Sequence, residues 1–224
     1  MKERGMIFNG EMVRALLDGR KTQTRRIIKD CTVGRDPISK FIKIGKKFIG
    51  CYPEDVPELI RECCPYGVPG DRIWVRETWA EAGASAPDLK LYRANYPEHV
   101  PSIYENVPPA EEIRWTPSIH MPRTASRILL EITDVRVERL NAISPEDAES
   151  EGLERTNFTG FGDEPGLPSY PEPDVYFDPL KKQWKEYPPE AFAGLWESIY
   201  GADSWQANPW VWVIEFKRVE GGAS

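Results

Sequence analysis

The stretch RILLEITDVRVERL, residues 127–140, decides the fold of this chain of 224 residues. Its apolar residues first alternate as Ile128, Leu130 and Ile132, and then shift by one position to Val135 and Val137. Alternation with a period of two is typical of a β-strand with one buried face. A change of parity within one strand indicates a bulge, which bends a sheet at the corner of a small barrel. We therefore expect a curved sheet that turns a corner at this strand.

Further strands and short helices are predicted on both sides of this stretch. Alternating or aromatic-rich segments predict strands over residues 6–8, 24–28, 72–79 and 210–216. Capping residues and glycines predict three helices, which begin after Asn9, after Ser144 and at Glu190 and end at Gly19, Gly152 and Gly201. Because strands and helices do not alternate in a βαβ rhythm, the fold class is α+β: a small, mostly antiparallel β-barrel with flanking short helices.

The length suits a single domain that spans residues 1–224. The chain has 21 prolines, and residues 82–122 and 155–190 each hold seven of them without sustained periodicity. We interpret these two segments as long proline-rich loop insertions. The sequence leaves three roles open for these insertions: lids, surfaces for a partner, or loops that the fold merely tolerates.

The charge is distributed unevenly along the chain. The formal net charge is −7, but residues 1–50 carry 13 Lys and Arg against 5 Asp and Glu, whereas the remainder carries 16 against 31. A basic N-terminal fifth can present a cationic surface to phosphates while acidic loops repel bulk nucleic acid. The alternative is an ordinary solvated charge distribution.

Neither a signal peptide nor a membrane span is predicted, because no apolar run has the required length. We expect a cytoplasmic protein without a membrane partner. The four cysteines lack the spacing of a zinc site, so we expect reduced thiols and neither a metal nor another cofactor; they are Cys31, Cys51, Cys63 and Cys64.

The segment GRKTQTRR, residues 19–26, concentrates four cations and three hydroxyl or amide side chains just after a helix. If Thr24 and Arg26 open a strand, its period places them on one face, which Lys21 can reach from the preceding turn. The alternative is that these cations complement the helix C-terminus and solvate a basic edge.

A carboxylate interrupts the apolar row of the strand predicted at residues 72–79. Ile73, Val75, Glu77 and Trp79 share one face there. Burial of an unpaired carboxylate is costly, so Glu77 needs a cationic partner, for which Lys21 is a candidate, or a proton. Alternatively, Glu77 faces water on a surface strand.

These two segments together resemble the ASCH domain, whose signature reads GxKxxExR and whose fold is a PUA-like barrel. The chain matches the glycine, the lysine and the arginine and departs at the sixth position, where Thr24 stands. It is similar there to small bacterial ASCH proteins that hydrolyse N4-acetylcytidine, and its texture (CPYG, GDRIWVRETW, IHMPRTASRI) looks closest to ASCH proteins of phages and prophages. The resemblance implies the catalytic set Lys21, Thr24 and Glu77.

Amide hydrolysis needs a nucleophile, a base and donors for the oxyanion. Thr24 offers the hydroxyl. Lys21 acts as a base only when neutral, so desolvation or the neighbouring Arg20, Arg25 and Arg26 must lower its pKa, whereas a contact with Glu77 would raise it.

Other residues are candidates for binding the substrate. Glu77 is expected to bind a substrate nitrogen or to shuttle a proton, with Arg26 on the acyl oxygen or a phosphate. Trp79 is the first candidate for stacking on a base, although a core position is the stronger interpretation. Arg123 and Arg127 could bind phosphate. Arg20 and Arg25 are further candidates for binding the substrate.

The leading hypothesis is therefore an amidohydrolase that acts on an N4-acylated cytosine nucleoside or a related small amide. The alternative is a noncatalytic module that binds RNA or a modified base through the same cleft. A ribonuclease ranks last, because no second general acid stands out. The expected partner is a modified nucleoside or RNA.

Overall fold

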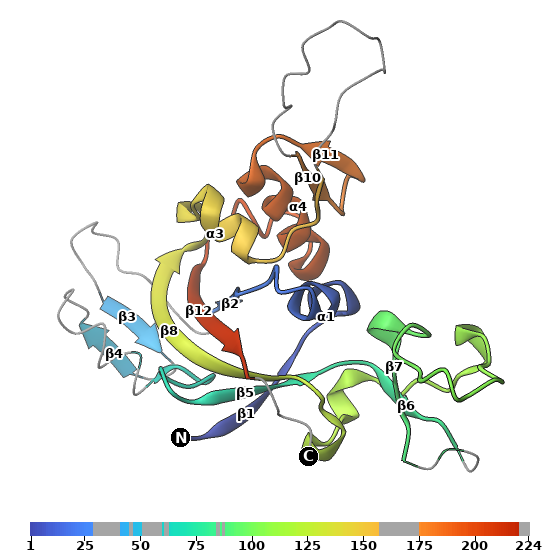
Figure 1. Ribbon diagram of the computed structural model, residues 1–224. Helices are drawn as coiled ribbons and strands as arrows, with labels where there is room; N and C mark the ends of the chain where they lie inside the picture. Colours follow the sequence, from blue (N-terminus) through green and yellow to red (C-terminus); the bar gives the residue numbers. More distant parts are fainter. Residues whose placement is uncertain are drawn as a thin grey trace, which may run out of the picture.

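The computed structural model describes residues 1–28, 41–44, 47–50, 60, 63–83, 86, 88–156 and 175–219. The chain is α+β, as expected, with a mainly antiparallel sheet and few helices (Figure 1). The central sheet has five strands, which lie in the order β1 (Glu3–Ile7), β5 (Arg72–Arg76), β8 (Leu129–Arg139), β12 (Trp210–Arg218) and β2 (Gln23–Ile27). β1 and β5 run parallel, and the other neighbours are antiparallel.

Smaller elements surround this sheet. Two hairpins, β3–β4 (Phe41–Ile44, Lys47–Gly50) and β6–β7 (Trp79–Glu81, Lys90–Tyr92), and a three-stranded sheet of β9 (Arg155–Thr156), β10 (Val175–Asp178) and β11 (Gln183–Lys185) lie outside it. The α-helices are α1 (Gly10–Leu17), α3 (Pro145–Ser150) and α4 (Pro188–Tyr200). Short 3-10 helices complete the chain: η2 (Arg93–Asn95), η3 (Ala110–Glu112), η4 (Ser118–His120), η5 (Arg123–Ala125) and η6 (Leu140–Ala142).

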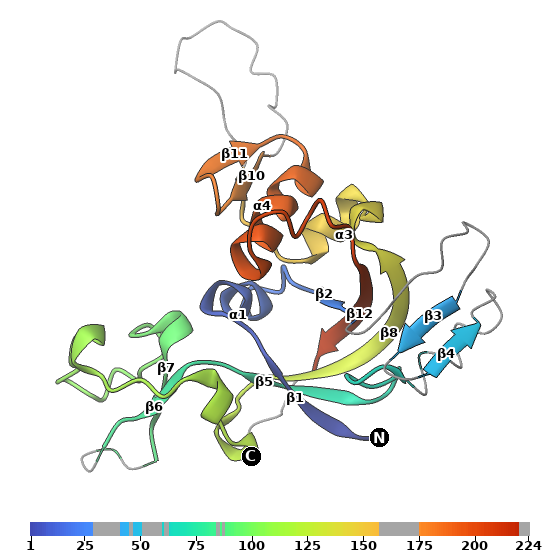
Figure 2. The same ribbon diagram turned by 180° about the vertical axis from the view of Figure 1, so that it is seen from behind.

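The bulge predicted in β8 is confirmed. Glu215 of β12 lies opposite Asp134, but the next residue, Phe216, lies opposite Ile132, so Thr133 is the extra residue. An extra residue increases the local bend of a strand. Both views show β8 and β12 curving together, with α1 on the concave side (Figures 1 and 2).

The edges of the curved sheet are β1 and β2, so among the described strands the sheet is open rather than a closed barrel. A side chain links the two edges. Arg26 Nη2 on β2 donates a hydrogen bond to the carbonyl oxygen of Ile7 on β1 at 2.8 Å, and its guanidinium lies over the Phe8 ring at 5.3 Å. The curvature brings the two edges within reach of one arginine.

Two hydrophobic cores lie on opposite faces of the sheet. The inner core joins apolar residues of β1, β5, β8 and β12 to α1, which buries Val13 and Leu16 there. The outer core packs Val211 and Val213 of β12 against α3, α4 and β10. Burial of these faces is the main favourable contribution to folding.

The helix boundaries follow the local chemistry that the sequence predicts. The Asn9 side chain accepts from the Met12 N–H at 2.8 Å and the Ser144 hydroxyl from the Asp147 N–H at 3.1 Å, so both residues cap as expected. The glycines after the helices adopt positive φ, 75° at Gly19 and 89° at Gly152. α4 begins at Pro188, two residues before the predicted start, because proline is favoured in the first turn.

One prediction about the strands needs correction. Residues 72–79 form two strands, β5 and β6, separated by Glu77 and Thr78, because the second strand pairs with β7 instead of β8. Where they are described, the proline-rich segments contain short elements: residues 82–122 contain β7 and three 3-10 helices, and residues 155–190 contain β9, β10, β11 and the start of α4.

Candidate functional site

The strand register decides which face each candidate side chain occupies. Thr24 lies opposite Ile214 and Arg26 opposite Trp212, and both β12 residues belong to the inner core. Directly opposed residues of an antiparallel pair point to the same face. Thr24 and Arg26 therefore share the inner face, as predicted, whereas Arg25 faces outward.

Lys21 is fully buried and contacts Glu151 instead of Glu77. Its Nζ donates to Glu151 Oε2 and to the Glu151 carbonyl oxygen, both at 2.8 Å. Among the described residues it forms no ion pair with Glu77, so the expected partner was wrong. The reason is topological: the turn after α1 runs beside the end of α3, and Lys21 and Glu151 form an isolated β-bridge.

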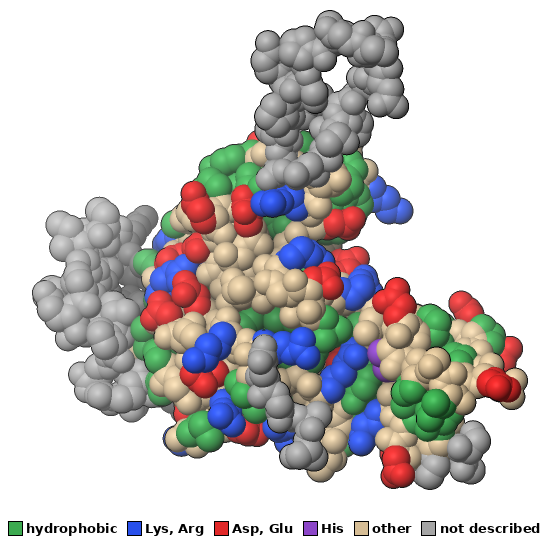
Figure 3. All heavy atoms as spheres, viewed as in Figure 1, with side chains coloured by type: hydrophobic (Ala, Val, Ile, Leu, Met, Phe, Trp, Pro, Cys, Tyr) green, Lys and Arg blue, Asp and Glu red, His purple; other side chains and the backbone are tan. Residues whose placement is uncertain are grey.

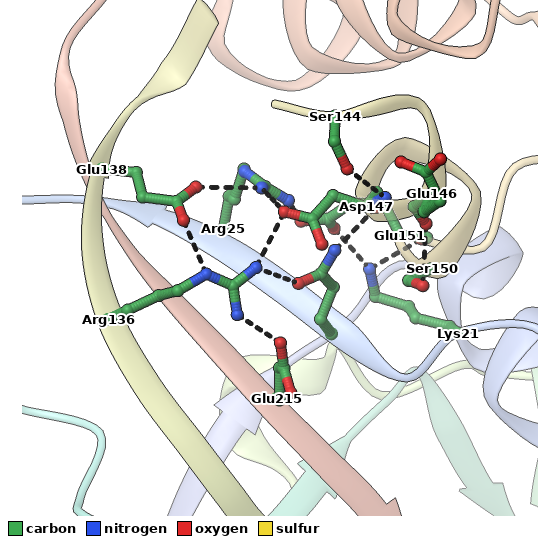
Figure 4. A network of polar contacts seen from close by, with 11 residues as sticks. Lys21, Arg25, Arg136, Glu138, Ser144, Glu146, Asp147, Ser150, Glu151 and Glu215 are labelled. Atoms are coloured by element: carbon green, nitrogen blue, oxygen red, sulfur yellow. Dashed lines mark hydrogen bonds and ion pairs between the residues drawn. The ribbon is translucent and has the colours of Figure 1, made fainter. Parts of the chain in front are cut away.

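Lys21 and Glu151 belong to a polar network on the outer face of the sheet (Figure 4). The buried Arg25 reaches three carboxylates. Its Nη2 lies 2.7 Å from Asp147 Oδ2 and 3.3 Å from Glu138 Oε2, and its Nη1 lies 3.3 Å from Glu151 Oε1. Arg136 on β8 donates to Asp147 at 2.7 Å and also contacts Glu138 and Glu215. The network fastens β2 and β8 to α3.

Burial and pairing shift the pKa values in this network in different directions. Burial lowers the pKa of the Lys21 amine more than the contact with Glu151 raises it. Burial alone would raise the pKa of Asp147, but hydrogen bonds from Arg25 and Arg136 outweigh it and lower this pKa. The neutral form of Lys21 is thus more accessible than that of an exposed lysine.

Glu77 forms a second polar cluster on the inner side of the sheet. Its side chain is buried, and Arg127 donates to its two oxygens in a bidentate pair, Nε to Oε1 and Nη2 to Oε2, both at 2.9 Å. Arg127 Nη2 also donates to Asn95 Oδ1 at 2.9 Å, and its guanidinium lies 4.0 Å from the centroid of the Tyr92 ring. The cationic partner expected for Glu77 is therefore Arg127, which is already engaged and is not a free phosphate ligand.

A pocket of about 430 Å³ opens beside Glu77. It lies where the parallel strands β1 and β5 end and α1 begins, and its lining includes Phe8, Asn9, Arg14, Glu77 and Arg93. Arg93 is exposed and has no ion-pair partner in the described part of the chain. Lys21 and Thr24 are not among the residues that line this pocket. The inner face thus holds Thr24, Arg26 and Glu77, but Lys21 lies elsewhere.

The remaining predicted binding residues have structural contacts. Trp79 is buried with Tyr92, Met121 and Ala125 in a small cluster, which supports the core interpretation. Arg20 pairs with Asp18 at 2.9 Å and donates to the carbonyl oxygens of residues 152 and 153. Arg123 pairs with Glu3 at 2.9 Å.

Several site residues could not be identified from the sequence alone. Glu151, Arg136 and Asn95 carry no motif, and each meets its partner across a long sequence separation. Asp147 is an acidic residue in the first turn of α3, a position that the sequence alone explains by helix stability and not by contacts with Arg25 and Arg136. Arg14 could have been recognised from the sequence, because the helical period places it on the exposed face of α1, away from the core.

Basic side chains gather in the middle of the face shown in Figure 3, between the α3–α4 part of the molecule and the β6–β7 hairpin. Acidic side chains are interspersed among them. The predicted cationic N-terminal fifth is only partly a surface feature, because Lys21 and Arg25 are buried in ion pairs. Its basic residues 29, 35, 40 and 46 lie outside the described residues.

Within the described ranges, no group of three His, Cys, Asp or Glu residues is arranged to hold a metal ion. Cys64 is buried, and burial raises the pKa of its thiol. Cys31 and Cys51 lie outside the described residues.

None of the described helices combines the length and the apolar character that crossing a bilayer requires.

No protein-family model matches the chain, and no curated protein or solved structure shows significant similarity to it.

Proposed function

We propose that the protein binds a nucleobase ligand, a modified nucleoside or a residue of RNA, in the Glu77 pocket. The observation that carries the proposal is a buried carboxylate, paired with a cation, at the wall of a pocket of about 430 Å³. Pockets for small molecules typically measure about 300–1,000 Å³. We also propose that the fold is PUA-like, as the resemblance to the ASCH domain implies.

The chemistry of Glu77 suits the amino edge of a base. An ionised carboxylate offers about four lone-pair sites, of which Arg127 uses two. The remaining sites can accept N–H groups of a cytosine or of its N4-substituted form. Arg127 also fixes the orientation of the carboxylate, which reduces the entropy that binding costs.

Arg93 adds a site for negative charge at the same pocket. Its exposed guanidinium can bind a phosphate attached to the nucleoside, whereas an unphosphorylated nucleoside gains nothing from it. The pocket therefore favours nucleotides or RNA residues over free nucleosides.

Isothermal titration calorimetry with N4-acetylcytidine and cytidine 5′-monophosphate tests this proposal. Glu77→Gln should weaken both ligands about tenfold or more, since it replaces an acceptor oxygen with a donor. Arg93→Ala should weaken only the phosphorylated ligand, and Arg218→Ala, another exposed arginine, should weaken neither. Unchanged affinity in Glu77→Gln, with the fold verified by circular dichroism, would refute the proposal.

A second candidate function is the hydrolysis of an N4-acylated cytosine nucleoside. The lowered pKa of Lys21 favours it, because a neutral amine can accept the proton of the Thr24 hydroxyl. Attack by the Thr24 oxygen on the amide carbon would form an acyl-threonine, the cytidine amine would leave with the proton, and water would release the acid. This route requires Lys21 to leave Glu151 and turn to the inner face.

Turnover of N4-acetylcytidine separates the two functions. Thr24→Val keeps the shape of the buried side chain but lacks the hydroxyl, so it should abolish turnover and leave binding unchanged. Binding without turnover in the wild-type protein supports the noncatalytic function, and turnover that persists in Thr24→Val contradicts the threonine mechanism.

A further inference from the structure

A second pocket lies in the α4 part of the molecule, on elements that take no part in the Glu77 pocket. Its volume is about 490 Å³, and its walls come from β11, the segment before it, the start of α4 and residues 141, 143 and 205. This volume is within the range of about 300–1,000 Å³ that small-molecule sites occupy.

The pocket combines an exposed aromatic ring with two cations. The Tyr187 side chain is 51% exposed and forms no capping hydrogen bond to α4, although it stands at the N-cap position. Lys181 and Lys185 also line the pocket, and neither forms an ion pair with a described residue. Exposed aromatic faces and unpaired cations are the groups that bind planar, negatively charged ligands.

The other lining groups add shape and polarity. Trp205 forms part of the wall and is held by an edge-to-face contact with Phe192 at 6.0 Å between ring centroids. Asn141 lines the pocket with an exposed side chain, whose amide can both donate and accept. Glu190 is the acidic residue of the lining and excludes ligands with negative charge on its side.

We propose that this pocket is a second ligand site, which binds a nucleoside monophosphate. The base packs against Tyr187, the amide of Asn141 hydrogen-bonds its edge, and Lys181 and Lys185 bind the phosphate. The proposal is independent of the function assigned to the Glu77 pocket, because the two pockets share no lining residue.

Titration calorimetry with adenosine 5′-monophosphate tests this site. Three variants isolate it: the double variant Lys181→Ala/Lys185→Ala removes the phosphate contacts, Tyr187→Ala removes the ring, and Lys217→Ala is a control on the far strand β12. We expect at least one binding component that the double variant weakens about tenfold or more and that Arg93→Ala leaves unchanged. Tyr187→Ala should weaken the same component, and because this ring is half exposed, the variant should keep its fold.

Adenosine and inorganic phosphate, each titrated alone, separate the two halves of the ligand. Both should bind at least tenfold more weakly than the nucleotide at this site. The absence of binding, or a double lysine variant in which every binding component keeps its wild-type affinity, would overturn the proposal. Equal affinity for inorganic phosphate would overturn the role of the ring, and equal affinity for adenosine would overturn that of the lysines.

Discussion

The ion pair of Glu77 and Arg127 is buried in the fold, and its carboxylate lines a pocket. The carboxylate is 1% exposed, and the guanidinium donates to it twice while also holding Asn95. Removal of one partner of a buried pair leaves an uncompensated charge, and the cost of that charge exceeds what the pair itself contributes.

We predict that Arg127→Gln lowers the free energy of unfolding by about 3 kcal/mol, since Glu77 then loses its cation. The matched control is Arg123→Gln, which removes a half-exposed arginine paired with Glu3 and should cost less than about 1 kcal/mol. Urea denaturation of the two variants measures both values. Equal losses in the free energy of unfolding would show that the buried Glu77–Arg127 pair stabilises the fold no more than an exposed ion pair does.

At the scale of elements, the turn between α3 and β9 must pass close to the turn after α1. Gly152 has a φ of 89°, and a Cβ atom there would lie 2.8 Å from the Cβ atoms of Ala15 and Lys21. Gly19 has a similar φ of 75°, but a Cβ atom there would meet nothing within 4 Å. The two glycines therefore separate the effect of backbone strain from that of close packing.

Gly19→Ala should cost about 1 kcal/mol, which is the strain of the left-handed conformation. Gly152→Ala should cost about 3 kcal/mol, because it adds a steric clash that displaces the segment holding Lys21 and Glu151. Thermal and urea unfolding of both variants check this difference. Equal stabilities would mean that the segment after α3 moves freely relative to α1.

The sequence predicted the elements of the main sheet better than the contacts between them. The parity change in residues 127–140 predicted the bulge, which the structure places at Thr133, and Asn9 and Ser144 predicted two helix starts, because these signals are local. The prediction of one strand over residues 72–79 was wrong in its second half, because alternation does not reveal that the chain changes its pairing partner from β8 to β7.

The candidate site was predicted only in part for a related reason. The shared face of Thr24 and Arg26 follows from the period of a strand. The partners of Lys21 and Glu77 lie 130 and 50 residues away, and no spacing rule connects them. Burial predicted that Glu77 needs a cation or a proton, and the cation proved to be Arg127 instead of the candidate Lys21.

At the scale of the whole molecule, two carboxylates make the free energy of unfolding depend on pH in the acid range. Asp147 joins β2, β8 and α3, and Asp71 accepts from the backbone N–H of Lys2 at 2.7 Å and from Arg4. For both, burial opposes ionisation, but hydrogen bonds outweigh it and the pKa is lowered in the folded state.

A lowered carboxyl pKa contributes stability that is present above the pKa of the unfolded chain, about 3.9, and is lost as the pH falls through the folded value. We therefore expect the urea midpoint to fall on acidification below about pH 4. Asp147→Asn should be less stable at pH 7 and should show a shallower acid dependence than the wild-type protein. A variant with the same acid dependence would show that other groups control it.

The Glu77 pocket and the ion-pair network lie on different sides of the main sheet. The Glu77 pocket lies at the ends of β1 and β5, whereas Lys21, Arg25 and Arg136 fix the outer face to α3.

The most direct measurement of the central claim is a crystal structure of the protein with N4-acetylcytidine. We predict ligand density in the Glu77 pocket, with a base nitrogen within hydrogen-bonding distance, about 2.7–3.2 Å, of a Glu77 oxygen and the Arg127 pair intact. A ligand bound elsewhere while the pocket holds only solvent would contradict the account.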